Sequence, residues 1–177
     1  LHHHVDTVCR LYPESGLIHV VRDPVRVALG RMSTNFPFPS IVFTESDEII
    51  RANYEGFQGL DDVRKLFLYI LIDNLVAVGK GAPFSNFAVF KLEDLKGNLS
   101  LLQDYLTGRG YKLSNYKERD FSKASSTSFL TKAMVKSPQI EEQRYFDHVY
   151  ERFGMNYRAS GYPILSIDSI SESLRSL

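Results

Sequence analysis

The segment Gly16–Ser33 constrains the fold more than any other part of the chain. Leu17–Val21 is a short apolar run, typical of a strand that is buried on both faces. Arg22 and Asp23 follow it, and Pro24 suits the first turn of a helix that Asp23 caps. The segment therefore predicts a strand that turns directly into a helix. A guanidinium then lies beside the helix N-terminus, where free N–H groups attract anions.

A long helical pattern and a second apolar run complete the coarse organisation. Apolar residues recur at helical spacing across Leu60–Gly79, which predicts a core helix crossing the sheet between two parallel strands. Phe87–Leu95 reads F-A-V-F-K-L-E-D-L, a strand followed by an acidic helix start. We expect Ser46 to cap another helix. We expect Tyr157–Leu177 either to dock a short strand around Ile164–Ile167 or to remain partly mobile. This alternation predicts an α/β fold with a parallel sheet flanked by helices.

The R-D-P tripeptide has two interpretations. In open α/β sheets, ligands bind in the crevice at the carboxyl ends of the strands. Because Arg can hold a phosphate through two parallel hydrogen bonds, Arg22 is a candidate anion ligand there. The simpler interpretation is a capped helix after a strand, with Arg22 in a surface ion pair. The tripeptide alone leaves both interpretations open.

The same residues carry a family resemblance. Strand–R-D-P–helix, with a small hydroxyl residue eight positions after the Arg, resembles the 3′-phosphate-binding motif of sulfotransferases. These enzymes use the sulfuryl donor 3′-phosphoadenosine-5′-phosphosulfate (PAPS). The resemblance implies that Arg22 holds the 3′-phosphate of PAPS. The position of the family's serine falls on Gly30, which offers a backbone N–H but no hydroxyl, and Ser33 is a candidate substitute.

Two further stretches resemble the family and follow in the family's order. The F-A-V-F-K-L-E-D-L run resembles a strand that ends in Y-E-D-L, with Leu92 in place of the aromatic residue. Ser125–Pro138 resembles the T-S-F…M-K…N-P segment that packs around the adenine. The match implies that Thr127, Ser128 and Phe129 bind the cofactor, with Phe129 facing the adenine. The Arg-Lys-Gly motif that gives the family further 3′-phosphate contacts is absent from the sequence.

The resemblance also implies a P-loop kinase-like sulfotransferase fold. The family opens with a strand, a glycine-rich loop and a helix that cradle the 5′-phosphosulfate through backbone N–H groups. The sequence contains no such loop; the G-K-G of Gly79–Gly81 follows a predicted helix rather than a strand. We therefore expect residues 1–177 to form a single sulfotransferase-like domain that is incomplete at its N-terminus.

The implied activity is sulfuryl transfer from PAPS to a hydroxyl or amine of a small-molecule or glycan acceptor. His4, in the run His2–His4, lies where the family places a catalytic His. An imidazole there would take the proton of the acceptor as it attacks sulfur. The alternative for this run is an ordinary helix start. No His, Cys or carboxylate cluster has metal-ligand spacing, so we expect no metal.

Charge and cysteine content restrict the partners. Lys and Arg number 21 and Asp and Glu number 21, so the formal net charge is zero. Such a chain has no global field for nucleic acid, and we expect no membrane segment. The single Cys9 cannot form an internal disulfide, which favours a reducing, cytoplasmic compartment. The sequence does not indicate an oligomeric state.

Two alternative functions remain open at this point. The first is a degenerate, non-catalytic sulfotransferase-like domain that binds a nucleotide or a protein, which Gly30, Leu92 and the missing loop favour. The second is a nucleotide kinase relative. That function needs a Walker-type Lys and a magnesium-binding Asp, neither of which stands in the required place.

Overall fold

A two-stranded parallel sheet lies at the centre of the computed structural model, which describes residues 4–33, 44–97, 99–111, 140–157 and 161–177. β1 (Leu17–Val21) pairs with β2 (Phe87–Lys91) in parallel, from Leu17 opposite Phe87 to Val21 opposite Lys91. Parallel strands require a crossover connection, and the helix α4 (Asp62–Gly81) belongs to it. The expected α/β class with a parallel sheet is confirmed, although the described structure is mostly helical.

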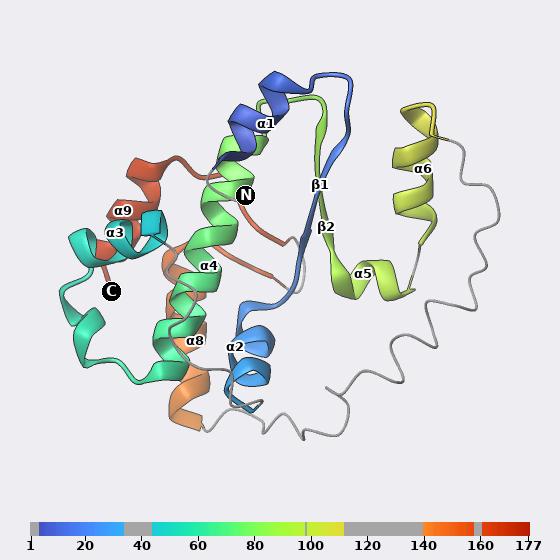
Figure 1. Cartoon of the computed structure of the whole chain (residues 1–177). Helices are drawn as coiled ribbons and strands as arrows, with labels where there is room; N and C mark the ends of the chain where they lie inside the picture. The colour runs from blue at the N-terminus through green and yellow to red at the C-terminus, as the bar shows by residue number, and fades with distance from the viewer. Residues whose placement is uncertain (1–3, 34–43, 98, 112–139, 158–160) are drawn as a thin grey trace.

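α4 is the central helix of the core. The Asp61 side chain caps it by accepting a hydrogen bond from the backbone N–H of Arg64 at 2.8 Å. Its residues from Leu66 to Val78 are buried on every side, as expected for a helix that is apolar all round. Figure 1 shows α4 along one face of the sheet and α6 (Ser100–Gly108) on the other. The predicted crossover helix is therefore correct.

Four helices pack around α4: α1 (Val5–Leu11), α2 (Pro24–Ser33), α3 (Thr44–Asn53) and α9 (Ile167–Arg175). α8 (Ile140–Arg152) joins the same core, where the Phe146 ring lies 4.7 Å from that of Phe67 in α4. The 3₁₀ helix η2 (Glu55–Gly59) buries Phe57 against Tyr69. These helices thus lie on the same side of the sheet as α4 (Figure 1).

Two sequence expectations about helix ends are wrong. α3 begins at Thr44, so Ser46 is a buried residue inside the helix rather than its cap. Residues 164–166 form no strand; instead Ser166 caps α9 by accepting a hydrogen bond from the backbone N–H of Ser169 at 3.1 Å. α9 then buries Ile170 and Leu174, because these positions face the core at helical spacing.

The glycines of the G-K-G sequence lie at the end of α4, where they serve packing. A Cβ on Gly79 would come closer than 3.0 Å to the carbonyl oxygen of Leu165. A Cβ on Gly81 would meet the Phe87 ring at similarly short range. In the ranges described above, no helix combines the length and the apolar character needed to cross a membrane.

Candidate functional site

The carboxyl ends of β1 and β2 bring together the acidic and basic residues that follow each strand. Arg22 and Asp23 follow β1 and precede α2, while Glu93 lies in the first turn of α5 (Leu92–Gly97), directly after β2. Because the strands are parallel and in register, their carboxyl ends meet at the same edge of the sheet. This edge is the place where open α/β sheets bind ligands.

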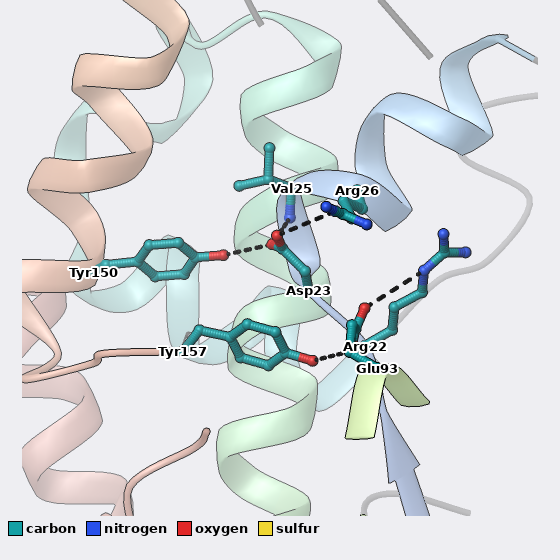
Figure 2. A network of polar contacts seen from close by, with 7 residues as sticks. All are labelled: Arg22, Asp23, Val25, Arg26, Glu93, Tyr150 and Tyr157. Carbon is teal, nitrogen blue, oxygen red and sulfur yellow. Dashed lines mark hydrogen bonds and ion pairs between the residues drawn. The ribbon is translucent and has the colours of Figure 1, made fainter. Parts of the chain in front are cut away.

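Asp23 organises the start of α2. Its Oδ1 accepts hydrogen bonds from the backbone N–H of Val25 at 3.0 Å and from the Tyr150 hydroxyl at 2.9 Å. Oδ2 lies 3.9 Å from Nε of Arg26 (Figure 2). Burial, and then the Asp23 charge, raise the pKa of Tyr150 above its ordinary value. Asp23 is therefore the predicted helix cap, held from a second side by α8.

Arg22 lies beside Glu93. Nε of Arg22 is 3.9 Å from Oε1 of Glu93, and the two side chains are 35% and 33% exposed. The terminal nitrogens of Arg22 point away from Glu93 in Figure 2, and the described residues provide no further polar partner for them. The simpler interpretation of R-D-P, a surface ion pair, is confirmed. The same geometry leaves the outer edge of the guanidinium accessible to an anion.

Tyr157 holds the other oxygen of Glu93. Its hydroxyl donates to Oε2 at 2.8 Å (Figure 2). Tyr157 is buried, and its desolvation, followed by the hydrogen bond to Glu93, raises the pKa of the phenol. Lys91 donates from Nζ to the backbone carbonyl of Tyr157 at 3.3 Å, and its ammonium lies 5.7 Å from the centre of the ring.

A chain of hydrogen bonds links β1 to Tyr162 through a residue of α4. Nε2 of His19 lies 3.1 Å from Oδ1 of Asn74, and the Asn74 amide donates to the Tyr162 hydroxyl at 2.9 Å. Burial raises the pKa of Tyr162 well above its ordinary value. The sequence places Asn74 among the apolar positions of the core helix, but the structure shows it as a buried polar connection between β1 and Tyr162.

A cleft of about 690 Å³ runs along the full length of β2. Its walls are apolar side chains from β2, α4 and α6, together with Tyr105 and Tyr162. Lys91 and Asp94, which lie 3.6 Å apart, form its polar end. Because Lys91 also contacts Tyr157, this end of the cleft adjoins the residues that hold Glu93.

The structure does not bring all the predicted site residues together. Gly30 lies in α2, and a Cβ built there meets no described atom within 4 Å. His4 is exposed at the start of α1, which packs towards the amino ends of the strands, away from Arg22 (Figure 1). Thr127, Ser128 and Phe129 lie outside the described residues.

Sequence reasoning missed the two tyrosines that complete the site. Tyr150 and Tyr157 come from α8 and the segment after it, far along the chain from the acids that they contact. The sequence did contain one signal, an acidic residue two positions after each strand: Asp23 after β1 and Glu93 after β2. A half-buried carboxylate requires hydrogen-bond donors, and these come from elsewhere in the chain. Within the described residues, no group of three or more His, Cys, Asp or Glu side chains could hold a metal ion.

Comparisons of the chain with protein-family models, with curated proteins and with solved structures found no match. The geometry of the site therefore carries the functional argument. The arrangement supplies a partly exposed guanidinium beside the N-terminus of a helix that Asp23 caps, at the carboxyl edge of a parallel sheet. Its chemistry suits a phosphate group.

Proposed function

We propose that this chain carries the 3′-phosphate side of the PAPS site of a sulfotransferase. The observation that carries the proposal is the position of Arg22, which lies directly after a parallel strand and beside the N-terminus of a ten-residue helix. At this position the guanidinium and the positive end of the helix dipole can act together on one phosphate. The P-loop kinase-like fold, of which the parallel pair and crossover helix would be a part, belongs to the same proposal.

In the proposed reaction the acceptor oxygen or nitrogen attacks sulfur in line. The S–O bond to the phosphate of PAPS breaks, adenosine-3′,5′-bisphosphate leaves, and a base takes the proton of the acceptor. His4 is our candidate for that base, although α1 lies away from Arg22. Thr127, Ser128 and Phe129 are our candidates for contacts with the nucleotide. Arg22 and the start of α2 would hold the 3′-phosphate, so that binding energy positions the sulfur.

The apolar cleft along β2 is our candidate for the acceptor site. It adjoins the residues that hold Glu93, and its lining suits the apolar body of a small molecule. Lys91 at its polar end could contact an acceptor hydroxyl or a negative charge near it. This assignment is part of the proposal.

Two observations favour a second candidate function, a non-catalytic nucleotide-binding or protein-binding domain. Arg22 already has a carboxylate partner in Glu93, and Gly30 provides no hydroxyl for a phosphate. Both features weaken anion binding relative to a site with an unpaired Arg and a Ser.

Calorimetric titration with adenosine-3′,5′-bisphosphate, against adenosine-5′-monophosphate, tests the proposal. We expect selective binding of the bisphosphate and a loss of about tenfold or more in Arg22→Ala, since a charge-assisted hydrogen bond contributes about 1.5–3 kcal/mol. Arg10→Ala is the matched control, because Arg10 is an exposed Arg of α1 paired with Asp6. Gly30→Ser should increase affinity by restoring the hydroxyl. Equal binding of both nucleotides, or full binding by Arg22→Ala, would refute the 3′-phosphate site.

Sulfuryl transfer separates the two candidate functions. A chain that binds the bisphosphate and also transfers sulfur-35 from labelled PAPS to a panel of phenols and amines is an enzyme. A chain that binds it selectively but transfers nothing to any acceptor supports the non-catalytic domain.

A further inference from the structure

The two oxygens of Glu93 are held with very different strength. Oε2 accepts a hydrogen bond of 2.8 Å from the Tyr157 hydroxyl. Oε1 is 3.9 Å from Nε of Arg22, which is too long for a hydrogen bond and leaves only charge attraction. Since about a third of each side chain is exposed, solvent screens that attraction. Arg22 is thus the loosely held member of the network.

Tyr157 keeps Glu93 in a fixed position. Its side chain is 7% exposed, and its ring packs edge-to-face with that of Tyr162 at 5.6 Å. Lys91 fixes the Tyr157 backbone through the carbonyl oxygen. An anion that approaches Arg22 therefore meets a guanidinium held by charge attraction alone, beside a carboxylate held by a hydrogen bond.

We propose that Glu93 is the counter-ion that Arg22 exchanges for a phosphate monoester, and that Tyr157 is the positioning residue that keeps Glu93 in place. This inference rests on the proposed function. Glu93 compensates the guanidinium when no ligand is bound, so an incoming phosphate must compete with Glu93 for Arg22. Glu93 therefore lowers the anion affinity of the site. Only an anion that binds Arg22 more strongly than Glu93 does can displace it.

Glu93→Gln tests the inference, because the amide oxygen still accepts from Tyr157 while the charge is lost. Glu45→Gln is the matched control: it makes the same change in α3, on a carboxylate of similar exposure that pairs with Lys80 at 2.7 Å. In titrations of the full chain with adenosine-3′,5′-bisphosphate, we expect Glu93→Gln to bind about two- to fivefold more tightly than the wild type. Glu45→Gln should remain close to the wild type.

A double-mutant cycle with Arg22→Ala provides a readout that a purely structural role of Glu93 would not change. The gain from Glu93→Gln should disappear when Arg22 is absent, since no guanidinium is left to release. The gain should also shrink as salt is added, because the competing charge is partly exposed. Glu93→Ala serves as a second variant with the same expected sign, and circular dichroism checks that each variant is folded.

The possible failures are distinguishable. If the wild type binds the bisphosphate but Glu93→Gln binds equally or more weakly, the counter-ion role is overturned and the proposed function stands. A gain that persists in the Arg22→Ala background also overturns it, because the gain then does not act through Arg22. If neither the wild type nor Glu93→Gln binds, the 3′-phosphate site and the counter-ion role are both overturned.

Discussion

Replacing two helical glycines by alanine should change stability in opposite directions. Gly30 in α2 and Gly79 in α4 both lie within helices, so the gain in helix propensity is the same for each, about 0.5–1 kcal/mol. Their surroundings differ. A Cβ at Gly30 meets no described atom within 4 Å, whereas a Cβ at Gly79 would come closer than 3.0 Å to the carbonyl oxygen of Leu165.

The size of each effect follows from these contacts. Gly30→Ala should stabilise the protein by about 0.5–1 kcal/mol, because no atom of the described residues opposes the propensity gain. At Gly79 the atom in the way belongs to the backbone of the segment before α9, so that segment must move. Overpacking of this kind costs about 1–3 kcal/mol, and the backbone contact places it at the upper end. Gly79→Ala should therefore destabilise the protein by about 1–2 kcal/mol.

Urea unfolding followed by circular dichroism measures both variants. With a slope of about 2 kcal/mol per molar urea, the midpoint should rise by about 0.3–0.5 M in Gly30→Ala and fall by about 0.5–1 M in Gly79→Ala. The slopes themselves should stay unchanged. If Gly79→Ala raises the midpoint as Gly30→Ala does, the close approach of Leu165 to α4 is wrong.

Two further predictions concern buried polar groups. Asn86→Ala should lower the free energy of unfolding by about 2–3 kcal/mol, because the amide nitrogen lies within 3.2 Å of the carbonyl oxygens of Cys9, Tyr12 and Ser15. Asn53→Ala, which removes one hydrogen bond to the backbone of its own helix, should lower the free energy of unfolding by less. Equal decreases in the two variants would contradict this prediction. Burial and the adjacent carboxylates raise the pKa of Tyr150 and Tyr157 above 10.0. Because the folded state holds these protons more tightly, their contribution to stability is complete below about pH 10 and is lost as the pH rises further. The urea midpoint of unfolding should fall as the pH rises above 10, and it should fall less steeply in Tyr150→Phe. The same dependence on pH in that variant would argue against a raised pKa of Tyr150.

The parts of the fold that were predicted correctly depend on short-range patterns. The strand before Arg22, the cap at Asp23 and the helix α4 each follow from residues within one or two turns of one another. The parallel crossover follows as well, because a strand, a long apolar helix and a second strand have few other ways to connect. The expectation that the first strand is buried on both faces is wrong, because Val20 is 49% exposed.

The C-terminal segment shows where such patterns fail. Ile164–Ile167 suggests a strand by its β-branched residues, yet Ser166 and Asp168 are a helix start that could have been read from the sequence. α9 is rich in serine and has modest intrinsic helix propensity. Its stability comes from burying Ile170 and Leu174 against the core, which is a tertiary effect.

The sequence by itself determined that a guanidinium follows a strand and stands beside a capped helix. That follows because the cap at Asp23 is a bond between residues two positions apart, which needs no other part of the chain. Only the tertiary structure decided that Glu93 faces Arg22 and that Tyr157 holds it there. Those contacts depend on the register of β1 against β2 and on where the segment after α8 is buried, and neither is encoded in the local spacing of residues.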